Sequence, residues 1–167
     1  MKKRWSLKYI LKEIVTTLLI LFIVSMALNY IRKPEINENI YSYKLTDIKN
    51  RKVDFKRYQG KPLVVHFWAT WCPVCKLEAA NIEQLSKEYS VITIAVNSGS
   101  NEELISFMKE HRLSYRVIHD KSASLAKKFN IEVYPTTLIY DKVGELKFTE
   151  VGYSTTLGLK ARLELIN

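Results

Sequence analysis

Residues 67–75 read Phe-Trp-Ala-Thr-Trp-Cys-Pro-Val-Cys, and they are the strongest indication of the fold in this sequence. Its two cysteines, Cys72 and Cys75, are the only ones among the 167 residues. A nearly continuous apolar run, residues 62–69, precedes them and is typical of a strand buried on both faces. Apolar residues then recur at helical spacing over residues 75–89. The sequence therefore predicts a cysteine pair where a buried strand ends and a helix begins.

This position has chemical consequences for the two thiols. A cysteine at the start of a helix faces unpaired N–H groups and the positive end of the helix dipole, which lowers the thiol pKa from about 8.5 into the range of about 3.5–7.5. The thiolate is the species that attacks disulfides. We expect Cys72 to make the attack and Cys75, one turn further on, to resolve the mixed disulfide. Pro73 suits the first helical turn because it lacks an N–H group.

Other interpretations of the pair are structural or metal-binding. A structural disulfide here would close a loop of two intervening residues and restrain the unfolded chain little. A zinc site needs further ligands, and the three histidines, His66, His111 and His119, are scattered. A copper-binding or copper-chaperone module is the alternative function that stays open. We predict no resident metal, and no organic cofactor because no glycine-rich phosphate loop is present.

The rest of the chain alternates strands and helices. Strands are expected at 43–48 and 52–55, as a short edge hairpin, and at 62–69, 91–96, 115–119, 136–140 and 145–151. Helices are expected at 75–89, from the N-cap Asn101 onward, at 122–129 and at 155–166. The alternation predicts an α/β domain over residues 43–167, and its final hairpin makes the central sheet mixed, flanked by helices.

The N-terminus has the pattern of a membrane anchor. Residues 14–31 are eighteen uncharged, mostly apolar residues, which as a helix span about 27 Å. We predict a cytoplasmic basic segment at 1–13, a single transmembrane helix at 14–31 and a tether at 32–42. A cleaved signal peptide, with a site near Ser25-Met26-Ala27, is the competing interpretation.

The net charge of +9 is concentrated around this apolar segment. Residues 1–33 carry seven basic residues and one acidic residue, with five of the basic ones before the segment. The positive-inside rule then places Met1 in the cytoplasm and the domain in the periplasm or its equivalent. No basic helix with interleaved aromatic residues follows, so we expect no nucleic-acid partner.

The quoted stretch resembles the active-site segment of the thioredoxin superfamily, over a match that covers about residues 43–166. Tyr134-Pro135-Thr136-Thr137 resembles the second hallmark, the cis-proline loop that faces the cysteines. The resemblance implies a thioredoxin-like fold, a redox-active disulfide and a cis bond between Tyr134 and Pro135. It also implies that this loop docks the substrate chain. Trp71, beside the first cysteine, is expected on the contact surface, and Trp68 in the core.

The predicted anchor and the added helix and strand over 101–119 resemble the TlpA-like branch, which includes ResA-like and DsbE-like proteins. The closing residues 151–154 and 158–163 look like the ScsD type. Glu78 matches an acidic residue that this branch keeps beside its active site, although a solvated helix residue is the other interpretation. His66 stands where thioredoxin has a buried carboxylate that helps to deprotonate the inner cysteine. It is either a proton acceptor or a hydrogen-bonded core residue.

Together these features predict an extracytoplasmic protein-disulfide oxidoreductase. Its expected partners are exported proteins with thiols or disulfides and a membrane redox partner. The direction of electron flow, which separates a reductant of specific thiols from an oxidant that introduces disulfides, depends on the redox potential, and the residues alone do not give that potential.

Overall fold

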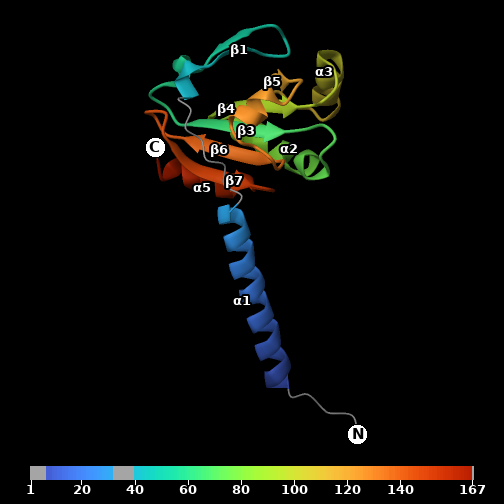
Figure 1. The fold of residues 1–167 in the computed structure, drawn as a ribbon, viewed down its shortest axis with the longest axis vertical. Coiled ribbons are helices and arrows are strands. Elements are labelled where there is room, and N and C mark those ends of the chain that lie inside the picture. The colour runs from blue at the N-terminus through green and yellow to red at the C-terminus, as the bar shows by residue number, and fades with distance from the viewer. Residues whose placement is uncertain (1–6, 32–39, 167) are drawn as a thin grey trace. The chain divides into compact units, whose positions relative to one another are not determined.

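The computed structural model describes residues 7–31 and 40–166 (Figure 1). The chain divides into two compact units, residues 1–33 and residues 34–167. The predicted basic segment 1–13 and the predicted tether 32–42 lie partly outside the described residues.

The first unit contains one helix, α1 (Leu7–Ile31). Its described side chains, at 11–21, 23 and 24, are exposed. Within the part of the chain that the structure describes, no helix combines the length and the apolar character that crossing a bilayer requires. The predicted anchor, residues 14–31, includes residues 22 and 25–31, whose side chains lie outside the described part.

A five-stranded mixed sheet forms the centre of the second unit, in the order β5-β4-β3-β6-β7 (Figure 1). Its strands are β3 (Leu63–Trp68), β4 (Ser90–Val96), β5 (Arg116–Asp120), β6 (Thr136–Tyr140) and β7 (Leu146–Val151). The first three are parallel, and the last two run antiparallel as a hairpin. The predicted mixed sheet and the predicted order of strands and helices in this unit are confirmed.

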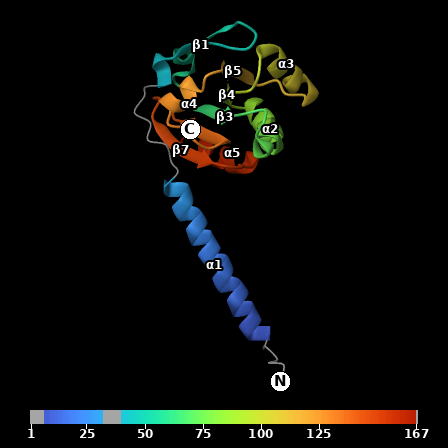
Figure 2. The same ribbon diagram turned by 45° about the vertical axis from the view of Figure 1, so that its right-hand side comes forward.

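The sheet separates two hydrophobic layers. One layer holds side chains from α2 (Pro73–Ser86), α3 (Asn101–Glu110) and α5 (Thr156–Glu164), and α2 and α5 pack against each other (Figure 2). The other holds side chains from α4 (Ser124–Lys128), β2 (Lys52–Asp54) and the short helices η1 (Ile40–Ser42) and η2 (Phe55–Tyr58). All six residues of β3 are buried because both layers cover this strand.

Alternation along β3 assigns its side chains to the two layers. Val64 and Trp68 belong to the layer that contains both cysteines, whereas Val65 and Phe67 belong to the opposite layer. Successive strand residues point to opposite faces, so His66 lies on the cysteine side of the sheet. The fold thus places a polar side chain in the layer beneath the redox pair.

The N-terminal hairpin differs from the expected edge of the central sheet. Strands β1 (Lys44–Thr46) and β2 pair as a separate two-stranded sheet. A single bridge between Asp47 and Ile118 and a hydrogen bond from the Ile48 N–H to the Val117 carbonyl (3.0 Å) connect it to β5. The predicted hairpin therefore forms, but it does not extend the sheet as a full edge strand.

The start of α3 corrects a second expectation. The sequence predicts Asn101 as the cap of this helix, but Asn101 is its first helical residue. Ser100 is the N-cap, and its side chain and that of Glu103 form a reciprocal capping box. Asn101 lies with its Oδ1 2.7 Å from Nδ1 of His119 at the end of β5. A serine one residue upstream can cap equally well, so the sequence alone did not separate the two.

Candidate active site

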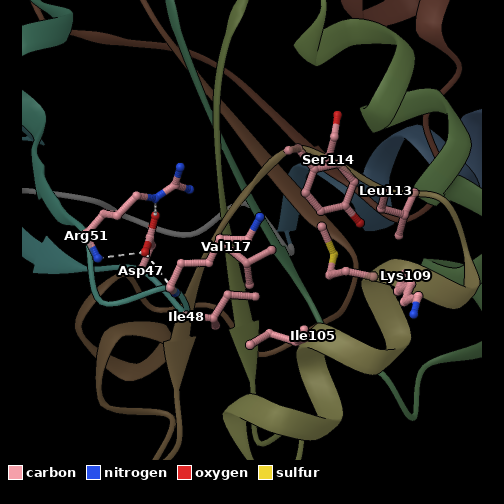
Figure 3. Close-up of a pocket in the computed structure, with 11 residues that line it drawn as sticks. Asp47, Ile48, Arg51, Ile105, Lys109, Leu113, Ser114 and Val117 are labelled. Carbon is pink, nitrogen blue, oxygen red and sulfur yellow. Dashed lines mark hydrogen bonds and ion pairs between the residues drawn. The ribbon is translucent and has the colours of Figure 1, made fainter.

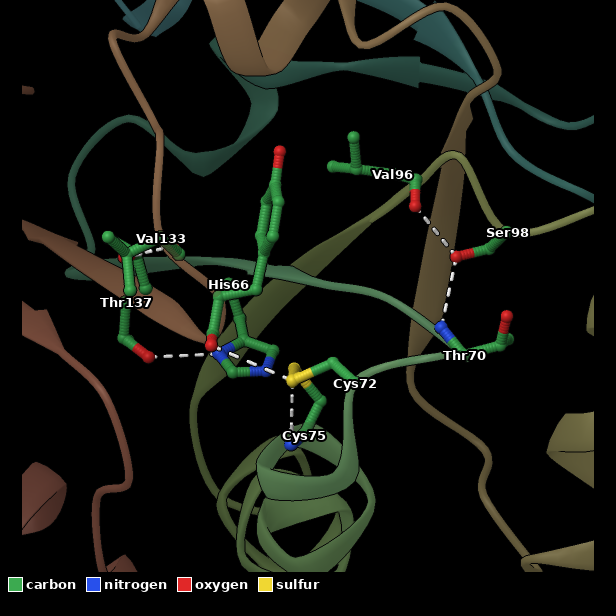
Figure 4. Close-up of a disulfide and its surroundings, with 10 residues drawn as sticks. His66, Thr70, Cys72, Cys75, Val96, Ser98, Val133 and Thr137 are labelled. Carbon is green, nitrogen blue, oxygen red and sulfur yellow. Dashed lines mark hydrogen bonds between the residues drawn. A yellow bond between two sulfur atoms is a disulfide. The ribbon is translucent and has the colours of Figure 1, made fainter.

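Cys72 and Cys75 form a disulfide at the start of α2, with their Cα atoms 5.3 Å apart (Figure 4). Cys72 is the N-cap residue, and its Sγ accepts a hydrogen bond from the Cys75 N–H at 3.2 Å. Pro73 is the first residue of the helix, as predicted. Because Cys72 Sγ already receives a helical N–H group, a negative charge on this sulfur would be stabilised as soon as the pair is reduced.

The loop before β6 reaches the redox pair from the other side. The Tyr134–Pro135 bond is cis, which confirms the prediction. The carbonyl oxygen of Tyr134 lies 3.6 Å from Cys72 Sγ. The Pro135 carbonyl accepts a hydrogen bond from the Gly152 N–H at 2.8 Å, where the backbone has a positive φ of 91°. The loop is thus held beside the sulfur that is predicted to react.

The two tryptophans of the motif occupy different environments. Trp68 is 2% exposed, and its indole N–H donates to Oγ1 of Thr93 at 3.1 Å. Trp71 is 57% exposed, and its indole N–H donates to the Asn97 carbonyl at 3.1 Å. The ring of Trp71 also stands edge-on to that of Tyr134, with the centroids 5.8 Å apart. An apolar, rigidly held ring therefore faces solvent next to Cys72.

His66 is buried, and its Nδ1 lies 2.9 Å from Oγ1 of Thr137. Figure 4 shows the imidazole ring directed at the cysteine pair. Burial lowers the pKa of His66 from 6.5 to about 3, so the ring is neutral in the oxidised protein near pH 7. The structure therefore agrees with the hydrogen-bonded core interpretation, and it adds a second nitrogen that faces the site.

Glu78 is completely buried one helical turn after Cys75. Its Oε1 accepts a hydrogen bond from the Ser154 N–H at 3.2 Å, and its Oε2 has no partner among the described residues. Burial raises the pKa of Glu78 from 4.5 to about 8, although the Ser154 N–H opposes that rise. The solvated-residue interpretation is wrong, and the side chain is a protonated carboxyl group near neutral pH.

A separate pocket of about 170 Å³ lies between the N-terminal hairpin, α3 and β5 (Figure 3). Its floor is apolar, with Ile48, Ile105 and Val117 facing one another, and no predicted site residue lines it. Among the described residues, no group of three or more histidine, cysteine or acidic side chains is arranged to hold a metal ion.

Sequence reasoning missed the residues that support the predicted ones. Thr137 was noted as part of a motif and not as the partner of His66, and Gly152 and Ser154 were not singled out as supports. Their contacts join positions 17 to 76 residues apart in the chain. The contact between His66 and Thr137 follows from the pairing of β3 with β6, which places these two residues opposite each other.

Comparisons with known proteins agree with a thioredoxin-like fold that carries a disulfide at the start of a helix. Residues 36–149 match the model of the AhpC/TSA family. The chain is 27% identical to a thioredoxin-like protein of Haemophilus influenzae over 95% of both chains. It is 28% identical to the thiol-disulfide oxidoreductase ResA of Halalkalibacterium halodurans, over 88% of this chain and 91% of that protein.

A solved structure supports the same assignment. The exposed lipoprotein thioredoxin of Streptococcus pneumoniae superposes with a TM-score of 0.65 at 25% identity, covering 74% of this chain and 98% of the other. The fold, the disulfide at the helix start and these relatives lead to one conclusion. The chain belongs to the AhpC/TSA family of thioredoxin-like proteins and is a thiol-disulfide oxidoreductase of the TlpA-like branch.

Proposed function

We propose that this protein exchanges disulfides with exported proteins outside the cytoplasm, through the Cys72-Pro-Val-Cys75 pair. The observation that carries the proposal is the position of Cys72, which caps α2 and already accepts the Cys75 N–H group. This arrangement favours a thiolate at the cysteine that lies beside the cis-proline loop. No organic cofactor takes part, since the two cysteines carry both electrons.

In the reducing direction, the protein transfers two electrons to a substrate disulfide. The Cys72 thiolate attacks one sulfur of the substrate disulfide, and the other substrate sulfur leaves as a thiolate and takes up a proton. Cys75 then loses its proton and attacks Cys72 Sγ, so the mixed disulfide breaks, the Cys72–Cys75 bond forms, and the second substrate sulfur leaves as a thiolate that takes up a proton. The substrate gains two electrons and two protons, and the protein loses the same, counting the proton that Cys72 gave up when its thiolate formed. The oxidising direction runs through the same steps in reverse.

Trapping tests the roles of the two cysteines. The Cys75→Ser protein should accumulate a mixed disulfide with a model substrate such as insulin, because the second step is blocked. The matched Cys72→Ser protein should accumulate much less, since Cys75 is 2% exposed against 6% for Cys72 and lies inside the helix, whereas Cys72 is the N-cap residue. Non-reducing electrophoresis with mass spectrometry identifies the adduct. Equal trapping by both variants would contradict the assigned order.

The location outside the cytoplasm is proposed from the sequence and from a relative. The uncharged segment 14–31, with five basic residues before it, is an anchor that leaves Met1 inside. The pneumococcal relative is described as an exposed lipoprotein, which supports an extracytoplasmic domain. Alkaline phosphatase fused after residue 42 should be active, and the full chain should resist carbonate extraction from membranes. Extraction would overturn the anchor, and a mature N-terminus near residue 28 would identify a cleaved signal.

The direction of exchange follows from the redox potential. Equilibration of the full chain with glutathione mixtures, read by alkylation of free thiols, gives that potential. A value near −270 mV identifies a reductant and a value near −120 mV an oxidant, about 150 mV apart. Either role needs a membrane redox partner to reset the pair, and cross-linking of the Cys75→Ser protein in intact cells is the way to capture it.

A further inference from the structure

Two buried side chains on neighbouring strands form a pair beneath the disulfide. His66 on β3 is directly opposite Thr137 on β6, and both belong to the face of the sheet that carries the cysteines. Nδ1 of His66 lies 2.9 Å from Oγ1 of Thr137. Figure 4 shows the ring between Thr137 and the cysteine pair. Nδ1 of His66 therefore holds the ring against Thr137, and Nε2 faces the two sulfur atoms.

The hydrogen-bonding needs of Thr137 decide which nitrogen carries the proton. A hydroxyl group has one hydrogen to donate, and a buried donor without an acceptor costs about 1–3 kcal/mol. Among the described residues, Nδ1 of His66 is the one group that forms a hydrogen bond with the Thr137 hydroxyl. If Nδ1 carried the hydrogen, the hydroxyl hydrogen would have no acceptor. The hydroxyl therefore donates to Nδ1, and a neutral ring then carries its hydrogen on Nε2.

The surroundings of His66 favour the neutral ring. Thr93 of β4 and Thr137 of β6 are its strand partners, and neither ionises. From α2, Cys75 and Glu78 face this layer, and burial keeps the Glu78 carboxyl protonated up to about pH 8. Tyr115, packed in the same layer, stays neutral because burial raises its pKa. None of these groups supplies the negative charge that an imidazolium would need in the oxidised protein.

We propose that Thr137 is a positioning residue that fixes the His66 tautomer, so that the Nε2–H group donates a hydrogen bond to the thiolate formed at the Cys72–Cys75 pair. The inference rests on the proposed function of the pair. His66 then acts as a fixed donor, like the N–H groups that stabilise an oxyanion, and not as the base that the family resemblance suggests. No proton leaves the ring during exchange. The proton of each thiol goes to solvent when its thiolate forms.

The test measures thiolate formation in the reduced full-length protein in dodecyl maltoside. Absorbance at 240 nm and the rate of alkylation by iodoacetamide are followed against pH. In Thr137→Val the Nδ1 acceptor loses its donor, so the pKa of the reactive thiol should rise by about one unit and alkylation at pH 6 should slow about tenfold. Thr137→Ser keeps the hydroxyl and should restore the wild-type profile.

Thr93→Val is the matched control. Thr93 is equally buried and pairs with His66 from the other side, but its hydroxyl accepts from Trp68 and donates to the Arg116 carbonyl. Thr93→Val should lower the free energy of unfolding without changing the pH dependence of thiolate formation. If thiolate formation in Thr137→Val had the same pH dependence as in the wild type or in Thr93→Val, the proposal would be overturned.

Nitrogen-15 spectra of histidine-labelled wild-type protein give a second readout that does not depend on the Thr137 variants. The chain has three histidines, and a His66→Gln spectrum assigns the signals of His66. A neutral ring with its hydrogen on Nε2 at pH 7 supports the proposal, and a hydrogen on Nδ1 or an imidazolium overturns it. A wild-type protein that exchanges with neither insulin nor glutathione would instead contradict the proposed function, which keeps the two failures distinct.

Discussion

The Glu78 carboxyl and the Ser154 N–H are joined by a hydrogen bond of 3.2 Å that ties α2 to the segment before α5. The second carboxyl oxygen has no partner among the described residues, and the side chain is 0% exposed. An ionised carboxylate in this position would be poorly solvated. The bond therefore holds a neutral acid one turn below Cys75, where a proton is available near neutral pH.

This buried acid should make stability depend on pH. The pKa of Glu78 is about 8 in the folded protein and about 4.5 when unfolded, so the folded state binds more protons between these values. The free energy of unfolding should fall as pH rises from about 4.5 to about 8, by a few kcal/mol at most. Glu78→Gln should flatten this decline in urea titrations.

Glu88→Gln is the control, because Glu88 is exposed and pairs with Lys160. Glu88→Gln should leave the decline of the free energy of unfolding with pH unchanged. A decline that persists undiminished in the Glu78→Gln protein would show that another group causes it.

His66 should have the opposite effect at acid pH. Burial lowers its pKa to about 3, so between about pH 6.5 and pH 3 the unfolded chain binds the extra proton. The free energy of unfolding should therefore decrease as pH falls through this range. His66→Gln should reduce the acid sensitivity measured by urea unfolding, whereas His111→Gln, at an exposed position, should not. Equal acid sensitivity in all three proteins would contradict the buried neutral ring.

Trp71 should matter for large substrates more than for small ones. Its exposed ring stands next to Cys72 and is held by Asn97 and Tyr134. In Trp71→Ala we expect the KM for insulin reduction to rise about tenfold, since a buried aromatic contact contributes about 1–2 kcal/mol. The rate with a small aromatic disulfide should change less than twofold.

Val143→Ala, at an exposed position in the β6–β7 turn, should leave both rates unchanged. If Trp71→Ala slowed both substrates to the same degree, the ring would be supporting the cysteine pair and not contacting the substrate.

The capping box at α3 offers a local test of stability. Ser100→Ala removes the side chain that accepts the Glu103 N–H at 3.2 Å. We expect a loss of about 1 kcal/mol in the free energy of unfolding. Ser106→Ala is the matched control in the exposed middle of the same helix, where alanine is the better helix former. A cost at Ser106 as large as that at Ser100 would contradict the cap assignment.

Local patterns were sufficient for much of the domain. The apolar run at 62–69, the cysteines that follow it and the final hairpin each depend on neighbours in the chain. The order of strands and helices and the mixed sheet could therefore be predicted. The cis bond at Pro135 was implied by the resemblance of the Tyr134-Pro135 loop to that of the thioredoxin superfamily. The capping residue of α3 could not be predicted, because Ser100 and Asn101 are both good caps and the contact of Asn101 with His119 joins residues 18 positions apart.

The redox pair and its place at a helix start could be predicted from the amino-acid sequence, since spacing and periodicity are local properties. The protonation of the groups around the pair depends on the tertiary fold. Burial depends on what packs above a side chain, and so Glu78 is a neutral acid and His66 a neutral ring. The partner of His66 depends on strand register, which joins it to Thr137 across 71 positions. The tautomer facing the sulfurs follows from that contact.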